Sequence, residues 1–292
     1  MEPTIISPRI RLASQLRVGD MLGRGGGQGA VYELPRHSGH VYKHYYAPID
    51  NARTSFTELV EAGRRLGPPL AAHGVSALWP VHVLGPGESV EGYVMPRMPD
   101  RFHTEIHTPY GPDRQEATLE FALEPDPDKA FYPLRVLSAG ERIELVRLVA
   151  LFLDTLHAHD LVYGDLSLKN MRFATDPIEL LVMDMDGVHH IATPVIPDKD
   201  LANTPDWNDP HRLSELPLGF DLDRYKYALL VYRLIVVNNV SEAFPEDAES
   251  IVVPADCGLN PEQREGVEFL LRRAAAGRTG SRPAIREWVG VL

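Results

Sequence analysis

The stretch "LVYGDLSLKN", Leu161 to Asn170, joins an apolar run to a polar end. Apolar side chains dominate as far as Tyr163, and Asp165, Lys169 and Asn170 then fall within six positions. A surface loop would explain this pattern, and so would a loop that carries reacting groups at the end of a buried segment. The rest of the chain decides between the two interpretations.

The bulk composition indicates a soluble globular protein. The chain has 292 residues, enough for two lobes or two modest domains, with 44% hydrophobic and 24% charged residues. A net charge of −12 argues against a nucleic-acid or anionic-membrane partner, which would need basic patches. The single cysteine, Cys257, excludes an intrachain disulfide and a cysteine-based zinc site. The start "MEPTIISPRIRLASQL" lacks the apolar core of a signal peptide, so we expect a cytoplasmic protein.

The N-terminal third predicts a sheet with one helix. β-rich runs occupy residues 30–35, 40–46, 76–85 and 91–98. Helical spacing runs from Thr54 to Leu66, with Thr54 or Ser55 as the N-cap and the Pro68–Pro69 pair near the end. Residues 99–137 show little periodicity, which predicts a long loop or an insertion.

From Ser138 onward the pattern becomes helical. Ser138 and Glu141 form a capping-box signature ahead of a strong amphipathic helix. Further helices are predicted over residues 223–237, 261–276 and 283–292. We therefore expect an α+β protein with a β-rich part over residues 1–98 and a helical part over residues 99–292, joined near Met95–Met98.

Glycine is concentrated in "LGRGGGQGAVY", Leu22 to Tyr32. Five of the seven residues from Gly23 to Gly29 are glycine. Glycine allows positive φ and lets the backbone approach a phosphate closely. Because the run lies between strand-like segments, it indicates a hairpin flap over phosphates; a flexible hairpin tip is the alternative.

Lys43 lies inside the apolar and aromatic run "VYKHYY". A surface lysine on an alternating strand is one explanation. A lysine that reaches phosphates under the glycine loop is the other, and a buried lysine would need a carboxylate partner. The following helix offers Glu58 and Glu61, of which Glu58 fits better.

Oxygen ligands follow on two later loops. Asp165 and Asn170 have D-x-x-x-x-N spacing, and the apolar run "LLVMDMDG" ends in Asp184 and Asp186. Carboxylate and amide oxygens suit Mg²⁺. Phosphoryl transfer requires a phosphate-covering loop, a lysine on the phosphates, oxygen ligands for metal and an aspartate near the attacking hydroxyl. The chain supplies each of these once, in that order.

With these motifs in this order, the chain resembles the protein kinase superfamily from about Leu22 to Trp288. Within that superfamily it is most similar to compact bacterial protein-kinase-like domains. The resemblance implies a bilobal kinase-like fold. The matching segments are the glycine loop, "VYK", the strand and hinge "GYVMPRM", the catalytic loop "YGDLSLKN", "MDMDG" in place of D-F-G, "TPDWNDP" at the end of the activation segment, "DLDRYKYALLVYRL" and "SRPAIREW".

The resemblance also implies roles for single residues. Asp165 would accept or orient the hydroxyl proton, Lys169 would steady the phosphoryl group, and Asp223 would anchor the catalytic loop. Asn170 and Asp184 would hold Mg²⁺, or Mn²⁺. Implied nucleotide-binding residues are Gly23, Gly25, Gly29, Val31, Lys43 paired with Glu58, the gatekeeper Met95, Pro96 and Met98.

The chain departs from the family pattern at several points. The glycine loop has one residue more than G-x-G-x-x-G, and Tyr163 and Gly164 replace the usual His and Arg, which makes control by an activation-loop phosphate doubtful. Asp186 replaces a glycine and is either an extra metal ligand or a loop-capping residue. His211 stands where a glutamate is usual, so we expect the usual ion pair between that position and Arg282 to be absent.

Three functions follow from these observations. The first is an ATP- and Mg²⁺-dependent kinase for Ser or Thr hydroxyls of a protein, such as a co-encoded partner. The second is a small-molecule kinase, which "YGD" and "DMD" favour. The third is a pseudokinase that acts as an interaction domain, which the unusual glycine loop favours.

Overall fold

The structure is a computed structural model in which the protein has a mixed α+β fold, with its sheets mostly in the N-terminal half, as predicted. It describes residues 11–23, 25–123, 130–192, 206–211, 219–278 and 280–292. Most of the N-terminal start, and the first two residues of "TPDWNDP", lie outside these ranges. The chain forms two compact units. Unit 1 comprises Met1–Ala71, Ala77–Pro99 and Met183–Asp186, and unit 2 comprises Ala72–Ser76, Asp100–Val182 and Gly187–Leu292.

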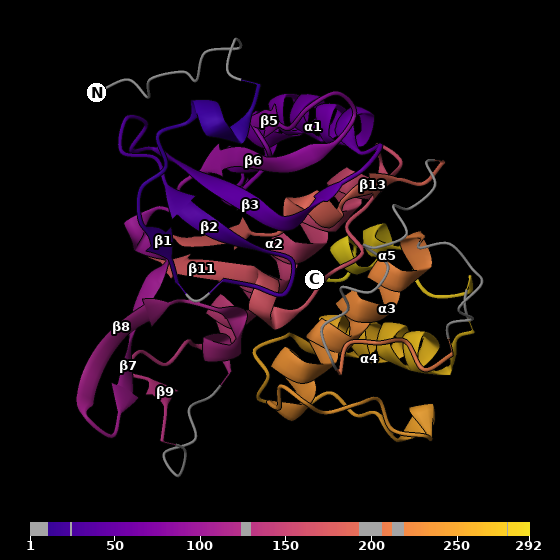
Figure 1. Ribbon diagram of the computed structural model, residues 1–292. Coiled ribbons are helices and arrows are strands. Elements are labelled where there is room, and N and C mark those ends of the chain that lie inside the picture. The colour runs from indigo at the N-terminus through magenta and orange to yellow at the C-terminus, as the bar shows by residue number, and fades with distance from the viewer. Residues whose placement is uncertain (1–10, 24, 124–129, 193–205, 212–218, 279) are drawn as a thin grey trace. The chain divides into compact units, whose positions relative to one another are not determined.

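Unit 1 is built on a five-stranded antiparallel sheet with the order β1-β2-β3-β6-β5 (Figure 1). Aromatic and β-branched side chains fill its central strands, as the sequence predicts. Helix α1 contacts the sheet at β5. The bounds are β1 Met21–Leu22, β2 Gly29–Glu33, β3 His40–Ile49, α1 Arg53–Ala71, β5 His82–Leu84 and β6 Val90–Pro96.

Helix α1 is longer than the sequence predicts. It begins at Arg53, where the Phe56 N–H bonds to the Ala52 carbonyl, so neither Thr54 nor Ser55 is the N-cap. It also continues through Pro68 and Pro69 to Ala71. Each proline forfeits a backbone hydrogen bond. Leu70 in the last turn is buried, and this burial offsets that loss.

The described residues of unit 2 form four α-helices and three small sheets. The Ser138 side chain accepts from the Glu141 N–H while the Glu141 carboxylate accepts from the Ser138 N–H, so the predicted capping box is confirmed. The helices are α2 Ala139–His157, α3 Phe220–Val231 with a π-helical extension Tyr232–Val237, α4 Pro261–Ala276 and α5 Ile285–Val289. Two of the sheets have the orders β11-β12-β4 and β10-β13, with β4 Val75–Ala77, β10 Leu161–Val162, β11 Met171–Thr175, β12 Ile178–Val182 and β13 His189–His190.

Within residues 99–137, the described part is not an irregular loop. Strands β7 His103–Thr108 and β8 Gly111–Glu116 form an antiparallel hairpin, and β9 Tyr132–Pro133 pairs with the other edge of β7. The six residues of β8 have no buried member. A strand without an apolar face lacks the alternation by which strands are predicted, which explains why the sequence pattern misses this hairpin.

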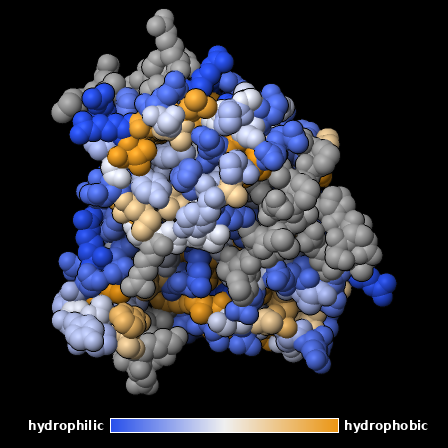
Figure 2. Space-filling view, in the orientation of Figure 1, coloured by the Kyte–Doolittle hydropathy of each residue, from blue (hydrophilic) through white to orange (hydrophobic). Residues whose placement is uncertain are grey.

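Burial follows the expected division between core and surface. The face seen in Figure 2 is mostly hydrophilic, and its hydrophobic residues lie in small groups. Among the described residues, no helix combines the length and apolar character needed to span a membrane.

Candidate functional site

The glycine-rich segment connects two strands of unit 1, as predicted. Residues 23–28 join β1 to β2, and Gly23 and Gly25 have φ of 70° and 72°, a region that favours glycine. A Cβ on Gly29 would lie 2.2 Å from the His44 carbonyl oxygen on β3. Gly29 therefore allows β2 and β3 to approach, while Val31 on β2 lies directly opposite Lys43 on β3.

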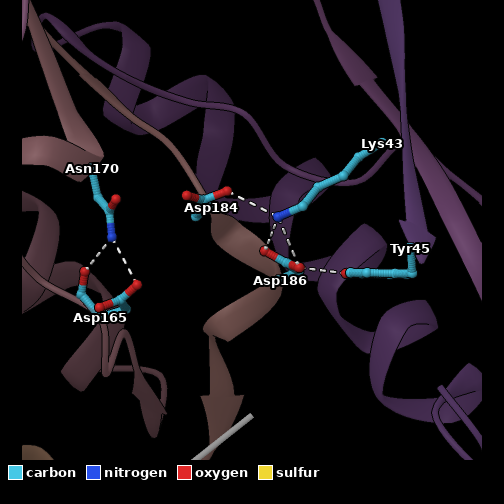
Figure 3. Close-up of polar contacts among 6 residues, drawn as sticks. All are labelled: Lys43, Tyr45, Asp165, Asn170, Asp184 and Asp186. Atoms are coloured by element: carbon cyan, nitrogen blue, oxygen red, sulfur yellow. Dashed lines mark hydrogen bonds and ion pairs between the residues drawn. The ribbon is translucent and has the colours of Figure 1, made fainter. Parts of the chain in front are cut away.

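Lys43 points from the middle of β3 toward two aspartates (Figure 3). Its Nζ donates to Asp184 Oδ1 at 2.9 Å and to both carboxylate oxygens of Asp186 at 3.2 Å. The Lys43 side chain is only 12% exposed, whereas the exposed fractions are 48% for Asp184 and 5% for Asp186. Asp184 itself has φ of 49°, in the left-handed region. The three charged groups share one site within unit 1.

The electrostatics of this site keep Lys43 charged. Burial lowers the pKa of Lys43, but the negative charge of Asp186, together with Tyr93 and Asp184, outweighs burial and holds that pKa well above its usual value. Burial and Asp186 also raise the pKa of Tyr45 well above its usual value, so its hydroxyl stays protonated. That hydroxyl donates a short hydrogen bond to Asp186 Oδ2.

The predicted pairing of Lys43 with Glu58 is wrong in this structure. The ion pairs described for Lys43 are with Asp184 and Asp186. Helix α1 turns Phe56 and Leu59 into the core and leaves Glu58 exposed. Because α1 packs through its apolar face, its carboxylates lie on the solvent side.

Asp186 was expected as an extra metal ligand or as a loop cap. Its carboxylate is instead turned to Lys43 and Tyr45 and is almost completely buried. This position favours pairing with Lys43 over metal ligation. Exposed Asp184 remains the oxygen donor of this loop that is open to an incoming ion.

Unit 2 holds the second group of predicted residues. Asn170 Nδ2 donates to the main-chain oxygen of Asp165 and to its Oδ2, each at 2.8 Å (Figure 3). A short 3₁₀ turn, Leu168–Asn170, brings the two side chains together, and Leu168 anchors it in the core. Lys169 of the same turn is exposed.

Asp223, the expected anchor of this loop, lies fully buried on helix α3. It accepts the N–H groups of Tyr163 and Gly164, each at 2.8 Å, and contacts His157 Nε2 at 3.1 Å. Lys226, one turn further along α3, is also buried, and its Nζ donates to the Gly164 carbonyl oxygen at 2.8 Å. Gly164 has φ of 78°, which explains why glycine stands at this position.

Sequence reasoning missed Lys226, although a lysine in an otherwise apolar helix is a usable signal. It also missed Arg172. Arg172 donates to the Lys169 carbonyl oxygen at 2.6 Å and to the carboxylate of Glu116 on β8. The hairpin within residues 99–137 is thereby tied to the Asp165–Asn170 loop, inside unit 2.

Arg282 forms ion pairs with two aspartates, although His211 replaces the carboxylate of its usual partner. Its fully buried guanidinium binds Asp209, with Nη1 2.8 Å from Oδ2, and Asp221 as a second partner. Asp209 lies two residues before His211 and supplies the carboxylate that His211 does not. Segment 206–211 is held further by Arg233, which donates to the Asp206 carbonyl oxygen and stacks over Trp207.

The predicted hinge residues follow one another at the end of β6. Met95 is buried opposite Val41, Pro96 lies opposite His40, and Met98 is half-buried just beyond the strand. The structure thus gathers the predicted side chains into two groups, Lys43, Asp184 and Asp186 in unit 1 and Asp165, Asn170 and Asp223 in unit 2.

Among the residues that the structure describes, no group of three or more His, Cys, Asp or Glu side chains could hold a metal ion alone. No protein-family model and no curated protein matches the chain.

Proposed function

We propose that the chain is an ATP- and Mg²⁺-dependent phosphotransferase with a bilobal protein-kinase-like fold, acting on Ser or Thr hydroxyls of a protein substrate. The observation that carries the proposal is the 2.9 Å bond between Lys43 and Asp184. The resemblance to protein kinases assigns Lys43 to the phosphates and Asp184 to the metal of one nucleotide. They lie 141 positions apart, yet their side chains meet.

Asp165 and Asn170 support the same proposal from unit 2. Asn170 holds the Asp165 carboxylate through its amide nitrogen, and the backbone before Asp165 is fixed by Asp223 and Lys226. A carboxylate fixed in this way can orient a hydroxyl and accept its proton. Lys169, exposed beside it, is suited to a transferring phosphoryl group.

The two residues that the resemblance assigns to Mg²⁺ each carry an oxygen suited to this ion. The amide oxygen of Asn170 and the exposed carboxylate of Asp184 are hard oxygen ligands, and Mg²⁺ at phosphates commonly takes one or two protein ligands. Such an ion would neutralise charge on the phosphates during transfer. Lys43 would bind phosphate oxygens, and the glycine loop would supply backbone N–H groups.

The proposal is tested by transfer of label from γ-labelled ATP to the protein itself or to a co-encoded protein. We expect Asp165→Asn and Asp184→Asn each to lower transfer by at least about 100-fold. Asp160→Asn is the matched control, because Asp160 is exposed five positions before Asp165 and its φ of 56° is one that asparagine tolerates. Wild-type transfer no higher than that of Asp165→Asn would end the protein-kinase proposal.

Two further measurements separate the alternative functions. ATP consumption with a metabolite pool, without labelled protein, would indicate a small-molecule kinase. A rise in melting temperature with Mg²⁺–ATP but no turnover would indicate a pseudokinase, because a ligand that binds only the folded state stabilises it.

A further inference from the structure

We propose that Asp186 and Tyr45 position Lys43 for the nucleotide, in place of a glutamate on helix α1. This inference rests on the proposed function, because it concerns the lysine that would bind phosphates. It assigns to Asp186 a role that its place in the D-x-D motif does not suggest.

The two aspartates differ in how they hold Lys43. Asp184 contacts Nζ through one oxygen and is about half exposed, so it can turn toward an ion. Asp186 contacts Nζ through both oxygens and is 5% exposed. Of the two, Asp186 therefore remains with the lysine when Asp184 binds elsewhere.

Tyr45 fixes Asp186 from the other side. Its hydroxyl donates to Asp186 Oδ2, and its ring packs against Phe56 of α1 and Tyr93 of β6, with centroid distances of 6.1 and 6.2 Å. Tyr93 also lies directly across from Lys43 in the sheet. The lysine Nζ is 5.8 Å from the centres of both tyrosine rings, a distance at which a cation is attracted to an aromatic face.

The arrangement determines which parts of the chain control Lys43. The carboxylate that orients the lysine lies on the same short loop as the exposed Asp184, two residues away. Helix α1 contributes the ring of Phe56 to this cluster, while Glu58 stays exposed. Binding of the lysine to phosphates should then depend on the loop and on Tyr45, and not on a charged contact from α1.

A double-mutant cycle on the nucleotide-free protein tests the pairing itself. Lys43→Met and Asp186→Asn each remove one charge and leave the other buried, so each should lower the melting temperature. The melting temperature of the double variant should fall by less than the sum of the two single decreases, because the two charges interact with each other. Strictly additive losses would show that the two side chains are not coupled and would overturn the inference.

Nucleotide affinity tests the positioning role. With the non-hydrolysable analogue AMP-PNP and Mg²⁺, titration calorimetry should show binding about 10- to 100-fold weaker for Asp186→Asn, the range typical when a positioning partner of a ligand-holding group is removed. Asp186→Glu should recover part of that loss, and Tyr45→Phe should weaken binding about 5-fold. Glu61→Gln, on the exposed side of α1, is the control.

The outcomes distinguish this inference from the proposed function. Wild-type protein that binds AMP-PNP, with Asp186→Asn and Tyr45→Phe binding as tightly or more tightly, overturns the inference and leaves the function standing. If Glu58→Gln weakens AMP-PNP binding and Asp186→Asn does not, the residue that positions Lys43 lies on α1. Wild-type protein that binds no nucleotide overturns both. Tyr45→Phe keeps the test decisive if Asp186→Asn does not fold.

Discussion

Replacing Asp223 with alanine would remove the acceptor of two buried backbone N–H groups, those of Tyr163 and Gly164. Leaving a buried donor unsatisfied costs about 1–3 kcal/mol. Two such donors give roughly 2–6 kcal/mol, and water entering the vacated space favours the lower half of that range. We therefore expect Asp223→Ala to lower the free energy of unfolding by about 3 kcal/mol, and Asp223→Asn, which keeps one acceptor oxygen, by about half as much.

The assay must report on unit 2 alone, because two units can unfold separately. Urea unfolding in a Trp79→Phe background meets this need, since the remaining tryptophans, Trp207 and Trp288, belong to unit 2. Glu265→Gln, an exposed acid on α4, is the control and should change stability by less than about 0.5 kcal/mol. If the free energy of unfolding of Asp223→Ala lies within about 1 kcal/mol of the wild-type value, a margin that covers the error of such measurements, the anchoring role is refuted.

Three further predictions concern stability. Arg282→Met should destabilise unit 2 by about 3 kcal/mol or more in urea unfolding, because it leaves the buried Asp209 and the partly buried Asp221 without their cation; an unchanged midpoint would contradict this pairing. Gly29→Ala should lower the melting temperature because its Cβ meets the His44 carbonyl, whereas Gly27→Ala, with open space around its Cβ, should not; equal effects would contradict the register of β2 and β3. Backbone and hydroxyl hydrogen bonds from Ser138 lower the pKa of Glu141, so its contribution to stability is complete above the ordinary pKa of 4.5 and is lost as pH falls through the lower folded-state value. The difference in melting temperature between wild type and Glu141→Gln should therefore shrink below pH 4.5, and a constant difference would contradict this capping interaction.

The local elements were largely predictable, because short-range signals specify them. Asn260 and Pro261 mark the start of α4, and the helix runs over the predicted residues 261–276. The aromatic run around Lys43 likewise becomes a central strand, β3. The hairpin of β7 and β8 was missed because β8 has no apolar face to pattern the sequence.

The partners of the charged side chains were harder to predict. Glu58 is 15 positions from Lys43 and was predicted because it lies on the next helix, whereas Asp186 is 143 positions away. Which carboxylate reaches a lysine depends on how a helix rotates its apolar face inward, and that rotation exposes Glu58. Arg282 shows the same difficulty, because His211 indicated only that the usual pair is absent, and no local pattern indicated Asp209 and Asp221 as the partners.

We propose that Lys43, Asp165, Asn170 and Asp184 serve one bound nucleotide, and a crystal structure with AMP-PNP and Mg²⁺ is the decisive experiment. We expect Lys43 Nζ on a phosphate oxygen, still bonded to Asp186, and a metal ion bound by both Asn170 and Asp184. A nucleotide bound away from these residues, or a metal ion that neither Asn170 nor Asp184 contacts, would contradict it.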